Sequence, residues 1–223
     1  MTVSVGTFNL NNLFSRFNFE AEISSLQELE GGITFSGHEH TEEGESYKVR
    51  TYKGKLVTKK DPERSAIIAG RIKEMNLDVL AVQEVEDRDA LKEFNAMFLD
   101  NMYSFISVID GNDPRLIDVG IMSKLPIGGF TSWQHTVHPD VPNQPIFSRD
   151  VLEVEILNKD RSKKLFTLYN NHLKSHFVDF REDPVEGAKK NNTTRKRQSE
   201  SLATIIKQRT RPGSNFIVTG DMN

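Results

Sequence analysis

The apolar positions of this chain repeat with periods that distinguish strands from helices. Residues 2–8 alternate between apolar and polar side chains, which predicts a strand that ends at Asn9. A near-continuous apolar run over 78–85 predicts a strand that is covered on both faces. Further strands are predicted over about 104–109, 118–123, 149–157, 164–171 and 215–219.

The first helix signal is the pair Asp61 and Pro62, an N-cap followed by a proline in the first helical position. Ile68, Ile72 and Met75 follow with the spacing i, i+4, i+7, which places them on one face of a helix. We therefore expect a helix that starts at Asp61 and turns these three side chains inward.

Two more helices are expected downstream. Asp87 or Asp89 is able to cap a helix that runs to about Asp100. The last helix is predicted over 194–209, with three basic residues in its first turns. These positive charges belong to a longer basic run, Lys189 to Arg197, which indicates either a solvated helix start or a contact with a phosphate backbone.

The order of these elements indicates the fold class. Strands follow one another over 103–171 and helices lie on either side of that region, which favours stacked β-sheets with helices packed outside, an α+β arrangement. Residues 18–60 are acidic and lack periodic apolar positions, so we interpret them as an excursion that carries a hairpin at 47–57. The remainder of 1–223 is expected to form a single domain.

Composition excludes several classes of protein. Leu, Ile, Val and Phe make up about 28% of the chain, enough apolar surface for a folded core. The absence of cysteine excludes disulfides, thiolate catalysis and cysteine-bound zinc. No apolar run is long enough to span a membrane and no signal peptide is present, so a cytoplasmic location is expected. The net charge of −3 argues against a chain coated with positive charge, although a local basic site remains compatible with it.

Polar side chains stand at the ends of four predicted strands, where a rigid scaffold can present a site. They are Asn9 and Asn11, Gln83 and Glu84, Asn171 and His172, and Asp221 and Asn223. Carboxylate and amide oxygens suit Mg²⁺ or Mn²⁺ better than zinc or copper. An imidazole among them is able to act near neutral pH as a proton shuttle or as a cation that faces phosphate.

The motifs at these strand ends resemble, in type and order, those of the endonuclease/exonuclease/phosphatase superfamily, which includes deoxyribonuclease I, exonuclease III-like repair enzymes, sphingomyelinases and inositol-polyphosphate phosphatases. They read Thr7-Phe8-Asn9-Leu10-Asn11, Val82-Gln83-Glu84, Asn171-His172-Leu173 and Gly220-Asp221-Met222-Asn223. The segments 118–126 and 147–150 add two further matches. The resemblance implies a four-layer α/β/β/α sandwich of the deoxyribonuclease I type and Mg²⁺-dependent phosphoester hydrolysis.

The resemblance also implies roles for individual residues. Glu84 matches a direct metal ligand, Asn9 a ligand or a residue behind one, and Asn11 a position at the metal site. Asp221 matches the residue that orients or deprotonates the attacking water, and Asn223 one that hydrogen-bonds the phosphate. The remaining matches are a catalytic His172, its acidic partner Asp118 that keeps it cationic, and phosphate contacts from Arg149 and Asn171.

Three functions remain open at this point. The first is a nuclease that acts on DNA or RNA, and the second is a phosphatase or phosphodiesterase that acts on a small-molecule or lipid head-group substrate. The third is a fragment without catalysis. In the family, further strands with an Asp and an Asp-His pair follow the Gly-Asp-x-Asn motif, whereas this sequence stops at Asn223. We therefore expect a fragment that is nearly inactive alone.

Overall fold

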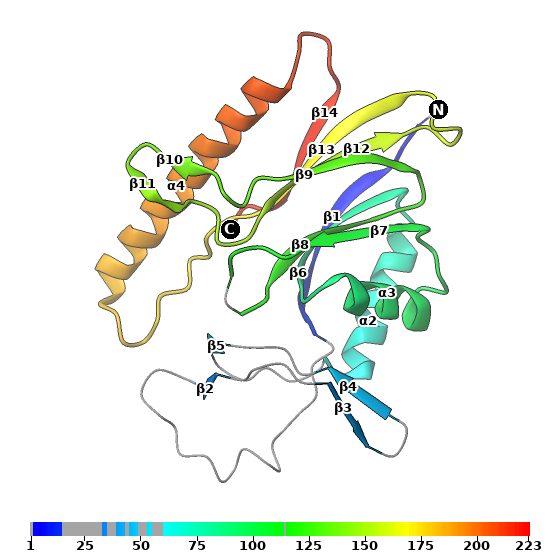
Figure 1. Cartoon of the computed structure of the whole chain (residues 1–223), viewed down its shortest axis with the longest axis horizontal. Helices are drawn as coiled ribbons and strands as arrows, with labels where there is room; N and C mark the ends of the chain where they lie inside the picture. The colour runs from blue at the N-terminus through cyan, green and yellow to red at the C-terminus, as the bar shows by residue number, and fades with distance from the viewer. Residues whose placement is uncertain are drawn as a thin grey trace.

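Two four-stranded sheets form the centre of the computed structural model, which describes residues 2–14, 33–34, 39–42, 45–48, 53–54, 60–113 and 115–223. The first sheet has the strand order β1 (Val5–Leu13), β6 (Val79–Val85), β8 (Asp118–Ser123), β7 (Phe105–Ile109). The second has the order β14 (Phe216–Asp221), β13 (Lys164–His172), β12 (Val151–Leu157), β9 (Ile127–Ser132) (Figure 1).

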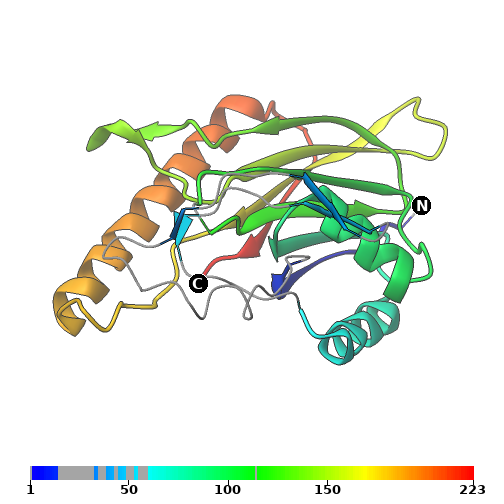
Figure 2. The same cartoon turned by 60° about the horizontal axis from the view of Figure 1, so that its bottom comes forward.

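Helices cover the outer faces of both sheets. α2 (Pro62–Met75) and α3 (Arg88–Phe98) pack on the first sheet through a core that includes Ile72, Leu80 and Phe94. α4 (Pro184–Arg209) packs on the second sheet through Leu202 and Ile205. Figure 2 shows α2 and α4 on opposite sides of the paired sheets.

A third apolar cluster fills the space between the sheets. Its members alternate along the strands with those of the outer clusters, as expected when each strand is buried on both faces. They are Val79, Ala81, Val119, Ile121, Leu152, Val154, Ile156, Phe166 and Leu168, with Leu125 beside them. The α/β/β/α sandwich expected from the sequence is therefore confirmed.

The sheet topology brings several strand ends together. β1 and β6 are parallel, with Asn9 opposite Gln83, and β13 and β14 are parallel, with His172 opposite Asp221. β8 runs antiparallel to β6 and begins at the end where β6 finishes. Polar residues that are distant in the sequence consequently meet at one end of the sandwich.

Most element starts follow local chemistry. The Asp61 side chain accepts a hydrogen bond from Glu63 N and caps α2 before its proline, and the Asp87 side chain caps α3 by accepting from Ala90 N. Asp87, rather than Asp89, is thus the N-cap of α3. Met75 is 39% exposed, so its expected place on the buried face of α2 is wrong. The helix ends in a left-handed Asn76, and its last turn lies beyond the core.

Three differences from the sequence expectation have identifiable causes. α4 begins at Pro184, ten residues before the predicted start at 194. The sequence did not predict these first turns, because they bury few side chains and show no apolar period. The strand β9 was not expected from its Gly-Gly sequence. Two short strands, β10 (Val137–His138) and β11 (Val141–Pro145), were missed because they are largely exposed.

The excursion at 18–60 is described only in part. β2 (Ile33–Thr34) pairs with β5 (Lys53–Gly54), and β3 (Glu39–Glu42) pairs with β4 (Glu45–Lys48). The hairpin predicted at 47–57 is therefore wrong, since the strands that overlap it pair with other segments. The remaining positions of 18–60 lie outside the described residues. Among the helices that the structure describes, none has the length and apolar character that a membrane crossing requires.

Candidate active site

A layer of hydrogen-bonded polar side chains, with Gln83 and Asn170 buried in it, lies between the apolar core and the site. Thr7 and Gln83 hydrogen-bond each other, and Gln83 Nε2 donates to Asn170 Oδ1 at 2.7 Å. Asn170 Nδ2 in turn donates to the carbonyl oxygens of Val82 (3.0 Å) and Gly120 (2.8 Å). Because Asn170 belongs to the second sheet and its partners to the first, this side chain ties the two sheets together directly beneath the site.

Glu84 occupies a bulge in β6. Leu80 and Val82 face the outer core, and regular alternation would place Glu84 there as well. Instead, the register of β6 with β8 shifts between Gln83 and Val85, and Glu84 has φ 59°. Val85 then rejoins the outer core, and Glu84 is the extra residue, turned toward β1. A left-handed glutamate costs conformational energy, and strain of this kind is concentrated at functional sites.

Asn9 links the two carboxylates of the site. Its Nδ2 donates to Glu84 Oε1 at 3.0 Å and to Asp221 Oδ2 at 2.9 Å. The other Glu84 oxygen accepts from the backbone N–H of Asn12 at 3.0 Å. Asn11 gives its backbone N–H to Asn9 Oδ1, while its side chain is exposed. Asn9 thus orients both carboxylates through its amide N–H groups.

Asp221 enters the site from the end of β14. Its Oδ1 accepts from the backbone N–H of Asn223 at 3.1 Å, and Asn223 Nδ2 donates to the carbonyl of Leu173. Gly220, just before it, has φ 133°, and a Cβ there would stand 1.9 Å from the Asn171 carbonyl oxygen. The close approach of β13 to β14 therefore requires glycine at this position.

His172 lies against Asp221. Its Nε2 stands 3.7 Å from Asp221 Oδ2, and the side chain is almost completely buried. Burial first, and the Arg149 cation second, lower the pKa of His172 to about 4. These two causes favour the neutral imidazole, whereas the sequence suggested a cation.

Asp118 and His172 lie in different sheets. Asp118 begins β8 of the first sheet and His172 ends β13 of the second, and among the described residues no hydrogen bond or ion pair joins their side chains, so the pairing that the resemblance implies stays a prediction. Asp118 Oδ1 accepts from Gly111 N at 2.8 Å. Burial, with the like charges of Asp110, Asp113 and Asp150 adding to it, raises the pKa of Asp118 to about 7.

Arg149 is a buried cation on the far side of His172. Its Nε lies 3.0 Å from Asp113 Oδ2, and Asp113 also receives two hydrogen bonds from the Arg115 guanidinium. Burial lowers the pKa of Arg149, and the charges of Asp113, Glu84 and Asp221 oppose that shift. Arg149 therefore lies within the electrostatic reach of both carboxylates of the site.

The expected site residues fall into two groups. Asn9, Glu84, His172 and Asp221 converge, and Arg149 faces them. Asn171 points to the opposite face of β13, since its neighbours Asn170 and His172 face inward, and its Nδ2 donates to Thr219 O. Sequence reasoning did not single out Asn170, although the alternation along 164–171 already placed it on the inner face.

The two carboxylates suit a hard cation that keeps some of its waters better than a metal that is bound only by protein ligands. In the described part of the chain, no group of three or more His, Cys, Asp or Glu side chains is arranged to hold a metal. Glu84 and Asp221, held by one amide, form a pair. A pair suits Mg²⁺, which binds through one or two carboxylates and keeps several waters.

Comparison with known protein families gave one match. The sequence model described as the Endonuclease/Exonuclease/phosphatase family matches residues 6–223. No curated protein sequence matches the chain.

Solved structures resemble the whole chain. A hairpin-deletion mutant of beta toxin from Staphylococcus aureus superposes with a TM-score of 0.56 at 14% identity, over 100% of this chain and 67% of that one. The mannosyl-6-phosphatase Bt3783 from Bacteroides thetaiotaomicron gives 0.53 at 15%, over 100% and 66%. A humanized D. rerio TDP2 with 14 mutations gives 0.53 at 13%, over 99% and 62%. At these identities the likeness shows the fold, and this chain spans about two thirds of each protein's length.

Proposed function

The chain belongs to the endonuclease/exonuclease/phosphatase family, whose members hydrolyse phosphoester bonds, and from this premise we propose a Mg²⁺- or Mn²⁺-dependent phosphodiesterase of the nuclease type. The observation that supports the proposal most is the shared amide of Asn9, which holds Glu84 and Asp221 side by side. A phosphatase acting on a small or lipid head-group phosphoester is the alternative that the sequence left open. A nuclease would cleave an oligonucleotide, and such a phosphatase would cleave only the small ester.

Each residue has a distinct role in this proposal. Glu84 and Asp221 would hold the cation, with Asn9 and Asn11 fixing the strand end, and the cation would supply Lewis-acid polarisation of a phosphoryl oxygen. Asp221 orients a water whose oxygen bonds to phosphorus as the ester P–O bond breaks. The proton that the water loses passes through Asp221 and the neutral His172 to the departing ester oxygen.

The other predicted residues act on the substrate. The Arg149 guanidinium faces the phosphate, for which its planar donors are well shaped. Asn171, which faces the opposite side of β13, is left out of the substrate contacts. A contact of Asn223 with phosphate and the pairing of Asp118 with His172 belong to the same proposal. So does the cytoplasmic location. Metal binding, which does not require turnover, is the primary readout.

The test is Mn²⁺ binding measured by paramagnetic relaxation of water protons. We expect Glu84→Gln to weaken Mn²⁺ binding by at least about tenfold, because it removes the negative charge at the centre of the pair. Glu155→Gln is the matched control, since that carboxylate lies elsewhere and pairs with Lys164 at 2.9 Å. Equal Mn²⁺ affinity in the wild type and Glu84→Gln would overturn the assignment.

A further inference from the structure

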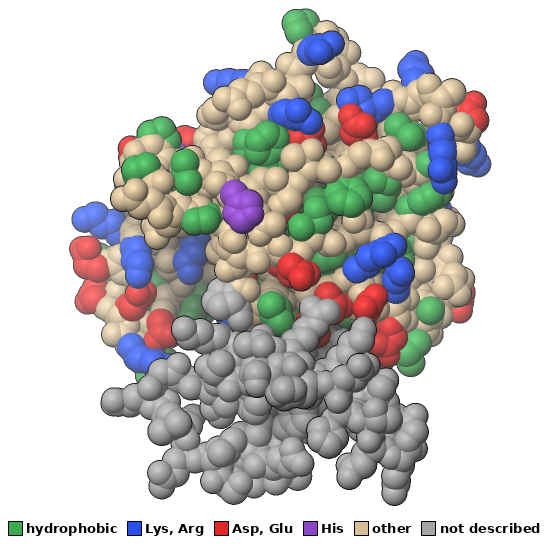
Figure 3. All heavy atoms as spheres, in the orientation of Figure 1, with side chains coloured by type: hydrophobic (Ala, Val, Ile, Leu, Met, Phe, Trp, Pro, Cys, Tyr) green, Lys and Arg blue, Asp and Glu red, His purple; other side chains and the backbone are tan. Residues whose placement is uncertain are grey.

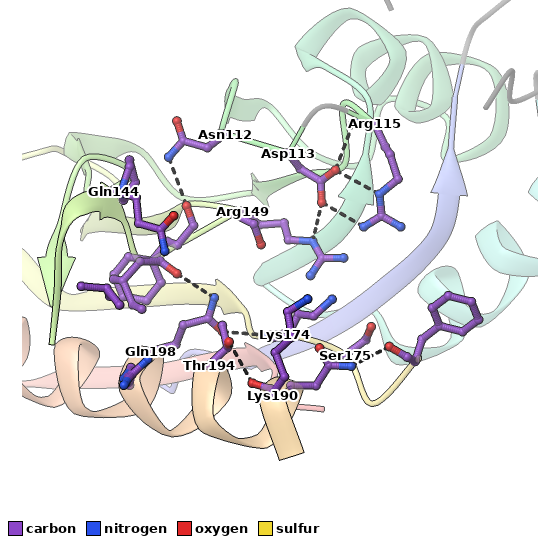
Figure 4. Close-up of a pocket in the computed structure, with 18 of the residues that line it drawn as sticks. Asn112, Asp113, Arg115, Gln144, Arg149, Lys174, Ser175, Lys190, Thr194 and Gln198 are labelled. Carbon is purple, nitrogen blue, oxygen red and sulfur yellow. Dashed lines mark hydrogen bonds and ion pairs between the residues drawn. The ribbon is translucent and has the colours of Figure 1, made fainter. Parts of the chain in front are cut away.

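A pocket of about 770 Å³ opens beside Arg149 on the side away from the carboxylate pair. Its walls come from the loop before β8, from β11, from the segment after β13 and from α4. Figure 4 shows Arg115 and Arg149 on one wall, with Lys174 facing them from the other. The pocket therefore continues from the candidate active site through a shared residue, Arg149.

Three cations of this pocket lie around the carboxylate of Asp113. Asp113 accepts two hydrogen bonds from Arg115 and pairs with Arg149 Nε, which occupies both of its oxygens. In the part of the chain that the structure describes, no hydrogen bond or ion pair reaches the ammonium of Lys174. Burial, then Arg149 and Arg115, lower the pKa of Lys174, which places all three cations within mutual reach.

The other charges around the pocket are paired. Lys190 binds Glu182 at 2.8 Å, and Arg197 binds Asp140 at 3.1 Å. The position of Lys174 is fixed by its backbone, whose N–H donates to Gln198 Oε1 at 2.7 Å and whose carbonyl accepts from Arg195 at 2.7 Å. Lys174 is thus held in place through its backbone, and within the described residues no carboxylate forms an ion pair with its ammonium.

We propose that Lys174, with Arg115, binds a second phosphate group of the substrate, one linkage away from the phosphoester that reacts. The inference rests on the proposed function and narrows it to a substrate with more than one phosphate, and the exposed ring of Phe177 favours a polynucleotide over a small polyphosphate. Lysine supplies a point charge and arginine a planar fork, and both are suited to phosphate. Phe177, 69% exposed at the rim of the same pocket, offers a ring on which the intervening base stacks.

The experiment compares the binding of two dinucleotides by calorimetry in the presence of a chelator, so that no turnover occurs. One carries a terminal phosphate at its 5′ or 3′ end and the other carries none. We expect the wild type to bind a phosphorylated dinucleotide with about tenfold higher affinity, because the terminal phosphate gains one charge-assisted contact. Lys174→Gln, which removes the charge and keeps a polar side chain, should reduce the ratio of the two affinities to about one.

Lys196→Ala is the matched control, because it removes the same charge from an exposed residue of α4 that lies outside the pocket and should keep the preference. Lys174→Arg should keep most of it. Phe177→Ala should weaken both dinucleotides alike. A wild type without preference, or a Lys174→Gln variant that retains it, would overturn the inference. Neither outcome changes the result of the Mn²⁺ binding test, so the further inference and the proposed function can be contradicted independently.

Discussion

At the scale of single residues, Gly220 shows how little freedom the site has. Gly220→Ala adds a Cβ that would stand 1.9 Å from a backbone oxygen of β13, at a φ of 133°. We expect the variant to lose more than about 2 kcal/mol of unfolding free energy, because backbone must move. Gly70→Ala, in open space on α2, should instead gain up to about 1 kcal/mol. Urea unfolding of both variants measures the contrast, and equal effects would contradict it.

Asp118 carries a pH dependence that can be isolated. Because folding raises its pKa from 3.8 to about 7, its contribution to stability is full below pH about 3.8 and is lost as the pH rises to about 7. This shift in the pKa of Asp118 corresponds to on the order of 4 kcal/mol of free energy between its two protonation states. Asp118→Asn keeps the acceptor for Gly111 N and does not titrate.

We therefore expect the stability of Asp118→Asn, relative to the wild type, to increase as the pH rises from 4 to 8. Urea unfolding at pH 4, 6 and 8 checks this difference. A difference that stays constant with pH would show that Asp118 titrates at its ordinary pKa despite its burial.

At the scale of elements, the cross-sheet bonds of Asn170 align β13 with β6 and β8. Asn170→Ala leaves Gln83 and two backbone carbonyls buried without their partner, and we expect a loss of about 2–4 kcal/mol. Asn158→Ala, which removes hydrogen bonds from an exposed turn, should cost less than about 1 kcal/mol. Thermal unfolding of the two variants separates them, and similar losses would mean that the bridge contributes little.

The same elements show which features local sequence signals predict and which depend on contacts between distant segments. Local signals were sufficient for the start of α2 at Pro62 and for β6, since caps and apolar runs act over a few residues. They were not sufficient to place Asp118 and His172 in different sheets, because which sheet holds β8 depends on pairing between distant segments. The bulge at Glu84 and the bridging by Asn170 are likewise set by packing between sheets. The first ten residues of α4 were missed since polar turns carry no period.

At the scale of the whole molecule, negative net charge and a positive pocket coexist. The face shown in Figure 3 carries acidic and basic side chains interspersed. Because the net charge is −3 and the described part of this face has no broad basic surface (Figure 3), we expect phosphate to bind mainly near Arg149 and Lys174.

The salt dependence of nucleic-acid affinity tests whether the phosphate contacts are confined to this pocket. Single-stranded nucleic acid loses affinity with a log–log slope of about −0.7 per neutralised phosphate, so two contacts predict a slope of about −1.4. Fluorescence anisotropy of a labelled oligonucleotide, titrated with KCl in the presence of a chelator, provides the measurement. Lys174→Gln should reduce the slope by about half, whereas Lys196→Ala should leave it nearly unchanged. A slope steeper than about −4 would require a broad basic surface. A flat response would mean that the pocket does not bind phosphate.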